Sequence, residues 1–275
     1  MRVQGGEEVS TAAATAHAER TVEVAGLTLR IMQAGEGDPI VVLHHSTGSP
    51  GWVPFLEQLS AHHAVTAPDL PGYGQSQRPE WARDARDLAI LLNQALDRLG
   101  LTDGVSLVGL GFGGFVAAEM ATMDQHRLAS LVLIGAAGIQ PDEGEILDQM
   151  LVDFVDYTKA GFSSDAAFAA VFGEEVDPAI KQLWDYSREM TARLTWKPYM
   201  FNRRLPHLLR EVRTPTLLIW GSRDVVVPVS AGRVYEKSLA NAELKVIEGA
   251  GHLVELEHPE RIAELISAHI GKHRA

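Results

Sequence analysis

Cysteine is absent from the 275 residues of this sequence. Its absence excludes disulfide bonds, thiolate nucleophiles and thiolate metal sites. Cations are also scarce, with 24 Lys and Arg against 36 Asp and Glu, which gives a formal net charge of −12. Such a charge repels phosphate backbones and anionic lipid surfaces. We therefore expect neither nucleic acid nor a membrane among the partners of this protein.

Long apolar runs are missing as well. No segment approaches the roughly 18–20 apolar residues that a membrane helix needs. The first twenty residues lack the basic and apolar regions of a signal peptide, and we interpret residues 1–19 as a mobile tail. The sequence predicts a soluble, cytoplasmic protein whose partner is a small molecule, and nothing in it indicates an oligomeric state. Hydrophobic residues make up 46%, enough for a large buried core.

Apolar segments of two kinds alternate along most of the chain. Short apolar runs predict strands, and spacings of three and four residues between apolar positions predict the helices between them. Strands that alternate with helices favour βαβ units and a mostly parallel sheet. We expect this α/β core to comprise residues 20–137 and 214–275. The expected strands are Thr21–Val24, Leu27–Met32, Ile40–Leu43, Ala64–Ala67, Val105–Val108, Leu131–Ile134, Thr216–Trp220 and Leu244–Ile247.

The alternation stops between residues 138 and 213, where no convincing strand is found. Apolar spacing predicts helices over Ile146–Val155 and Leu183–Leu194. A helical insertion of this kind is typical of a cap above the site of an α/β sheet. The segment is rich in aromatic residues, most of which we expect to hold the cap on the core, while a few line an apolar substrate pocket.

A glycine-rich turn joins the strand at Val105 to a helix in the segment V-S-L-V-G-L-G-F-G-G. It matches the dinucleotide fingerprint G-x-G-x-x-G, but that motif needs a carboxylate after the next strand. The next strand ends Leu133-Ile134-Gly135-Ala136-Ala137, without one. The turn also matches the nucleophile elbow G-x-S-x-G, in which Gly111 takes the place of the serine. We favour this second interpretation.

Four other segments support it. They are the oxyanion-loop segment H-H-S-T-G from His44, D-L-P-G-Y-G-Q-S from Asp69, G-S-R-D from Gly221 with Pro228, and G-A-G-H from Gly249. Together with the elbow, in this order, they resemble the α/β-hydrolase superfamily over about residues 20–272. The resemblance implies a mostly parallel central sheet flanked by helices with an inserted helical cap. The cap and the spacing are similar to those of meta-cleavage-product (carbon–carbon bond) hydrolases and related esterases.

The resemblance also implies roles for single residues. His252 would be the base, and Asp224 would orient it through a hydrogen bond. The backbone N–H groups of Phe112 and Ser46 would form the oxyanion hole. His45 stands where the family has glycine, so it would line the site and either reshape the oxyanion loop or supply a donor. The resemblance implies no cofactor, and the adjacent His44 and His45 diverge too far to chelate a metal.

Gly111 excludes acyl-serine chemistry and leaves three interpretations open. In the first, His252 and Asp224 activate water for hydrolysis of a small apolar carbonyl compound. In the second, the same pair acts on a proton of the substrate, as in a lyase, a decarboxylase or a cofactor-free oxygenase. In the third, the protein binds a small molecule without catalysis. The sequence also does not distinguish a natural glycine at position 111 from one engineered in place of a serine.

Two expectations concern replacement of the nucleophile. Ser46 lies on the oxyanion loop but lacks the elbow geometry of a nucleophile. If the pair and the oxyanion hole are intact, restoring serine at position 111 should create esterase activity.

Overall fold

One eight-stranded sheet forms the centre of the molecule in a computed structural model that describes residues 17–273. The strand order is β1-β2-β4-β3-β5-β6-β7-β8, with β2 antiparallel to β1 and β4 and the other pairs parallel. The strands are β1 Ala18–Val24, β2 Leu27–Ala34, β3 Asp38–Leu43, β4 His63–Pro68, β5 Val105–Leu110, β6 Leu128–Ile134, β7 Thr216–Gly221 and β8 Ala242–Ile247. This is the α/β fold that the sequence predicts, with every expected strand present.

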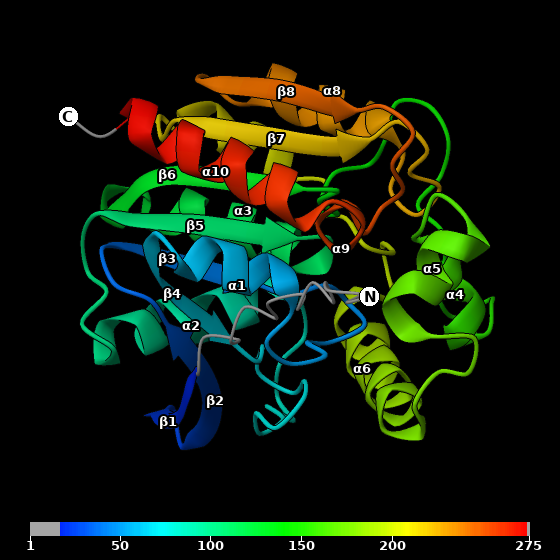
Figure 1. Cartoon of the computed structure of the whole chain (residues 1–275). Coiled ribbons are helices and arrows are strands. Elements are labelled where there is room, and N and C mark those ends of the chain that lie inside the picture. The colour runs from blue at the N-terminus through cyan, green and yellow to red at the C-terminus, as the bar shows by residue number, and fades with distance from the viewer. Residues whose placement is uncertain (1–16, 274–275) are drawn as a thin grey trace, which may run out of the picture.

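Helices cover both faces of the sheet (Figure 1). Helices α2, α3 and α8 pack on one face and α1 and α10 on the other, each with its own buried apolar cluster. These helices are α1 Pro54–Ser60, α2 Ala85–Arg98, α3 Phe112–Met123, α8 Val229–Ser238 and α10 Pro259–His273. Short connecting helices are η1 Gln125–Arg127, α7 Leu205–Leu208, η2 Leu209–Glu211 and α9 Val254–Glu257. Burial on both faces explains why the central strands β5, β6 and β7 are nearly continuous apolar runs.

Three helices lie beyond the carboxyl ends of the parallel strands (Figure 1). They are α4 Phe154–Ala160, α5 Asp165–Phe172 and α6 Pro178–Thr195. They fall inside residues 138–213, for which the sequence predicts a helical cap. Their aromatic residues form a separate buried cluster that contains Phe162, Phe168 and Trp184. The segment thus lies where the parallel strands of an α/β sheet place their ligands.

The helix predicted over Ile146–Val155 is wrong for most of its length. The structure has turns there, and α4 begins only at Phe154, where the carboxylate of Asp153 accepts the N–H of Val155. The N–H of Leu147 donates to the carbonyl of Val226 instead of to a helical partner. Leu151 is 82% exposed. The apolar residues of this segment are spaced as on a helix, but they belong to a loop that packs on the core.

The expected tail of residues 1–19 falls mostly outside the described residues, and β1 begins inside it, at Ala18. Within residues 17–273, no helix is both long and apolar enough to cross a membrane.

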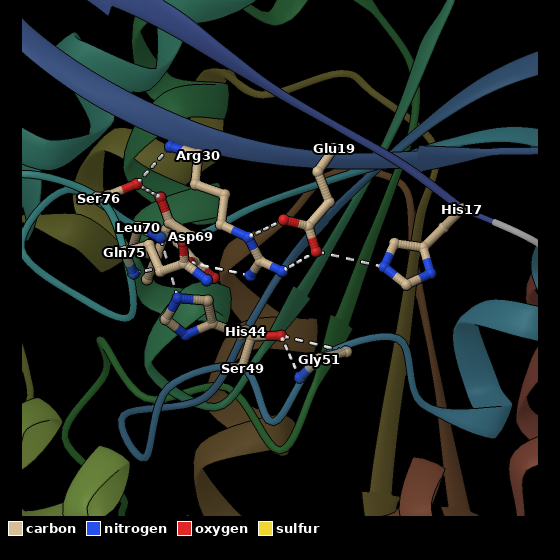
Figure 2. A network of polar contacts seen from close by, with 10 residues as sticks. All are labelled: His17, Glu19, Arg30, His44, Ser49, Gly51, Asp69, Leu70, Gln75 and Ser76. Carbon is tan, nitrogen blue, oxygen red and sulfur yellow. Dashed lines mark hydrogen bonds and ion pairs between the residues drawn. The ribbon is translucent and has the colours of Figure 1, made fainter. Parts of the chain in front are cut away.

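A buried polar network fixes the loop that follows β4 (Figure 2). The carboxylate of Asp69 is 1% exposed, accepts the backbone N–H of Gln75 at 2.9 Å and pairs with Arg30 at 3.3 Å. The hydroxyl of Ser76 donates to the carbonyl of Asp69 at 2.8 Å. On its outer side Arg30 pairs with Glu19. Because the network ties β1, β2 and this loop together, we assign Asp69 to structure and not to catalysis.

Candidate active site

The turn between β5 and α3 has the backbone of a nucleophile elbow. Gly111 has φ 51° and ψ −111°, a conformation that strains any residue with a side chain. The flanking glycines are required by close packing. A Cβ on Gly113 would overlap the carbonyl oxygens of Leu43 and His44, and a Cβ on Gly109 would overlap the backbone of Gly114. The elbow geometry is therefore kept although the serine is missing.

His252 and Asp224 meet at the carboxyl ends of the strands. Nδ1 of His252 lies 2.8 Å from Oδ2 of Asp224, and both side chains are buried. The other carboxylate oxygen of Asp224 accepts the backbone N–H groups of Val226 and Val227 at 2.9 and 2.8 Å. A carboxylate only accepts, so Nδ1 of His252 carries the proton and Nε2 is left free for chemistry. The loop after β7 thus holds Asp224 rigidly against the imidazole.

Two opposing effects set the pKa of His252. Burial disfavours the imidazolium, but the charge and the hydrogen bond of Asp224, with a contribution from Glu255, outweigh it and raise the pKa above 6.5. A raised pKa makes His252 a stronger base than a free imidazole.

The free nitrogen of His252 faces the elbow. Nε2 lies 3.0 Å from the point that a Cβ of residue 111 would occupy. In addition, Gly135, at the end of β6, leaves room for the pair, since a Cβ there would lie 2.9 Å from Nδ1 of His252. The structure therefore brings His252, Asp224 and Gly111 together at the elbow.

His45 fills the space that the serine would need. Its Nδ1 lies inside contact distance of the same Cβ point of Gly111, and its ring centroid lies 5.0 Å from that of His252. Nε2 of His45 lies 3.0 Å from a carboxylate oxygen of Glu255, on α9. A serine at position 111 would collide with this imidazole unless it moved. The imidazole of His45 must therefore shift for a serine to fit at position 111, and the esterase activity expected of Gly111→Ser stays a prediction.

The proposed oxyanion groups lie beside the elbow. The N–H of Phe112 is at the first turn of α3, where helical N–H groups have no partner within the helix. Ser46 is 4% exposed, and its hydroxyl lies 3.3 Å from the hydroxyl of Tyr157, on α4. Burial raises the pKa of Tyr157 to about 12, which keeps that phenol protonated at neutral pH. The Ser46 side chain thus contacts the cap, and among residues 17–273 its hydroxyl has no hydrogen bond to a base of the kind that a nucleophile requires.

His44 points away from His45 and has a structural role. Its Nε2 accepts the N–H of Leu70 at 2.9 Å (Figure 2). Its Nδ1 lies 2.7 Å from the carbonyl of His45. Burial lowers the pKa of His44, so the ring is neutral and carries its proton on Nδ1. It joins the oxyanion loop to the loop after β4.

Two cavities meet at His45. One, of about 10 Å³, is lined by His45, Ser46, Tyr157 and His252 among others. The other, of about 50 Å³, extends from His45 and Glu255 between the cap and the core. Its walls are mostly apolar and include Val53, Phe55, Leu56, Phe172, Trp184, Leu253 and Leu256. Within residues 17–273, no group of three or more His, Asp or Glu side chains is arranged to hold a metal ion.

Sequence reasoning missed Glu255 and Tyr157. Glu255 lies in the otherwise apolar segment Leu253-Val254-Glu255-Leu256, and it is 1% exposed. A buried carboxylate needs a partner, so an acidic residue inside an apolar segment next to His252 was an available signal. Its partner could not be predicted, because His45 lies 210 residues away in the chain. Tyr157 gave no signal that separates it from the other cap aromatics.

Comparison with known proteins gives the same fold. A 2-hydroxymuconate semialdehyde hydrolase of Pseudomonas sp. strain CF600 is 28% identical, with 90% of this chain and 92% of that protein covered. A 2-hydroxy-6-oxo-6-(2'-aminophenyl)hexa-2,4-dienoic acid hydrolase of Metapseudomonas resinovorans is 26% identical over 94% and 92%. The solved structure of a meta-cleavage product hydrolase of Pseudomonas fluorescens superposes with a TM-score of 0.77 at 22% identity, over 93% of this chain and 98% of that one.

The sequence profile of the alpha/beta hydrolase family matches residues 40–265. This match spans the sheet from β3 to β8, the elbow, the cap and the loops that carry Asp224 and His252. The chain therefore belongs to the alpha/beta hydrolase family.

Proposed function

We propose that this protein is an enzyme that hydrolyses a small, largely apolar carbonyl compound, with water and not a serine as the nucleophile. The observation that carries the proposal is the position of His252. Its imidazole is oriented by Asp224 at 2.8 Å, and its free Nε2 faces the bare elbow residue Gly111. A general base aimed at an elbow without a side chain is suited to the deprotonation of water.

The reaction follows from these positions. Nε2 of His252 takes a proton from water, the water oxygen bonds to the carbonyl carbon, and the carbonyl π electrons move to its oxygen. The N–H groups of Phe112 and Ser46 stabilise that oxyanion. When the oxyanion collapses, the bond to the leaving group breaks and the leaving group takes the proton from His252. The products are a carboxylic acid and a protonated leaving group, and no residue is acylated.

The apolar cavity and the named relatives support the substrate class. The relatives are hydrolases of 2-hydroxy-6-oxo-dienoates and of 2-hydroxymuconate semialdehyde, carbonyl compounds with a short carbon chain. We propose a compound of this kind, cleaved at a carbon–carbon bond next to a ketone or aldehyde. The cavity beside His45 would receive its apolar end.

Kinetics of three proteins test the proposal. The wild type should turn over at least one member of a panel of 2-hydroxy-6-oxo-dienoates and aryl esters, and His252→Ala should lower kcat by about 10²–10⁴-fold. His258→Ala is the matched control, because His258 is half-exposed beside the same loop and should leave kcat unchanged. Equal turnover by the wild type and His252→Ala would overturn the proposal. Tight binding of a substrate analogue without any turnover would show a binding protein instead.

Mass spectrometry of an acid-quenched single turnover tests the absence of a covalent intermediate. The proposal predicts the unmodified protein mass at every time point. A transient acyl adduct on any residue would contradict it.

A further inference from the structure

His45 and Glu255 form a second histidine–carboxylate pair beside the first. Both side chains are buried, with 7% and 2% of their side-chain surface exposed. Nε2 of His45 lies 3.0 Å from Oε1 of Glu255. Because the carboxylate accepts, Nε2 of His45 carries a proton, and in the neutral form of the ring Nδ1 presents a lone pair. In this form His45 is an acceptor toward the site, whereas the sequence left open that it supplies a donor, and that expectation stays a prediction.

Nδ1 of His45 is buried without a hydrogen-bond partner among residues 17–273. A buried acceptor that is left unpaired destabilises the fold. The nitrogen is directed at the elbow, since the nearest atom to a Cβ built on Gly111 is this Nδ1 and the next residue met is His252, through Nε2. Two free imidazole nitrogens from two different loops therefore converge on the same point.

Both rings line one small cavity, together with Tyr157 and Gly161 from the cap. The cavity that both rings line has a volume of about 10 Å³. This is close to the roughly 10–15 Å³ that one buried water needs. Such a water has two O–H groups, and the two rings offer one acceptor each.

On the basis of the proposed function, we infer that His45 is a second catalytic acceptor and that His45 and His252 together hold the attacking water. One O–H of the water donates to Nε2 of His252 and the other to Nδ1 of His45. This leaves the oxygen lone pairs directed toward the carbonyl carbon. Glu255 is a positioning residue, because its hydrogen bond fixes which nitrogen of His45 is free. The proton still passes to His252, and His45 removes the rotational freedom of the nucleophile.

The sizes of the residues at positions 45 and 111 support this role of His45. The family pattern has a glycine on the oxyanion loop and a serine at the elbow, and this chain has His45 and Gly111. The imidazole enters the space that the serine vacates, so the two differences form one change of the site. A ring that only filled space would not need a buried carboxylate to fix its tautomer.

A crystal structure of the wild-type protein with resolved waters tests the inference without relying on turnover. It should show one ordered water within hydrogen-bond distance of both Nδ1 of His45 and Nε2 of His252. The inference is overturned if His45 has no water on Nδ1, even where the proposed function survives. Failure of the proposed function would appear separately, as turnover that does not depend on His252.

Variant kinetics provide the second measurement. His45→Ala should lower kcat about 10²-fold with KM changed less than about threefold, since orientation of the nucleophile is lost. His45→Gln, which retains an acceptor, should recover at least tenfold of that loss, whereas a purely structural role predicts no such recovery. Glu255→Gln should also lower kcat, and His63→Gln, at a buried histidine that contacts Ser267, is the control and should not. An acyl adduct on His45 after acid quench would make it a nucleophile and overturn the inference.

Discussion

The imidazole of His45 faces the bare Cα of Gly111, and Nδ1 of the ring lies within contact distance of the point that a Cβ of residue 111 would occupy. Neither residue explains the site alone. A glycine at the elbow removes the nucleophile, and a histidine on the oxyanion loop fills the vacated space with a nitrogen acceptor. We interpret the pair as a conversion of the site from covalent catalysis to catalysis by water.

The raised pKa of His252 predicts the pH dependence of the reaction. His252 must be neutral to accept a proton, so kcat/KM should fall as the pH drops through a pKa above 6.5. Asp224→Asn removes the charge that raises this pKa, so the acid limb should move to lower pH. We also expect kcat to fall about 10³–10⁴-fold, because the tautomer is no longer fixed.

A pH–rate profile of both proteins checks this prediction. The charged and titratable groups that face His252 are Asp224, Glu255, His45 and Tyr157. Because the pKa of Tyr157 is raised to about 12, this phenol carries no charge in the acid range. Tyr157→Phe is therefore a useful control and should leave the acid limb in place. An acid limb that is the same in the wild type and in Asp224→Asn would contradict the assignment of His252 as the base.

The apolar cavity predicts substrate preference. Trp184 is 3% exposed and lines the cavity between cap and core. Trp184→Leu should enlarge the cavity, lower kcat/KM for the smallest substrates and raise it for substrates with a bulkier apolar end, by about tenfold in relative terms. Comparison of kcat/KM across a homologous series measures the shift. Val171→Ala, at an exposed position of α5, should change neither value, and an equal shift there would show that the cavity does not select the substrate.

The elbow glycines predict a large effect on stability. A Cβ on Gly113 would overlap two backbone carbonyl oxygens, which no side-chain motion can relieve. Gly113→Ala should therefore destabilise the fold by about 3 kcal/mol or more. Gly271→Ala is the matched control, because Gly271 is an exposed position of α10 at which a Cβ meets nothing within 4 Å. This variant should be neutral or should stabilise the fold by up to about 1 kcal/mol. Urea denaturation compares the two, and equal midpoints would contradict the packing of the elbow.

The sequence predicted the sheet well, because the central strands β5, β6 and β7 are buried on both faces and are therefore short apolar runs. Local sequence motifs singled out Asp224, His252 and Gly111, which the structure brings together, and their roles in the reaction stay a prediction. The prediction of a helix over Ile146–Val155 was wrong for most of its length, because these apolar residues belong to a loop that hydrogen-bonds to the core at Val226. The contact of His45 with Glu255 joins distant segments, and no local pattern reports such a contact.

Labelling with a fluorophosphonate tests the central claim most directly, namely that His45 occupies the volume of the deleted serine. The wild type and His45→Gly should not react, and Gly111→Ser alone should react little, because the imidazole blocks the new side chain. The double variant His45→Gly/Gly111→Ser should be labelled stoichiometrically at residue 111 and should hydrolyse aryl esters. Labelling of Gly111→Ser as fast as the double variant would contradict the account, and so would labelling of the wild type at Ser46.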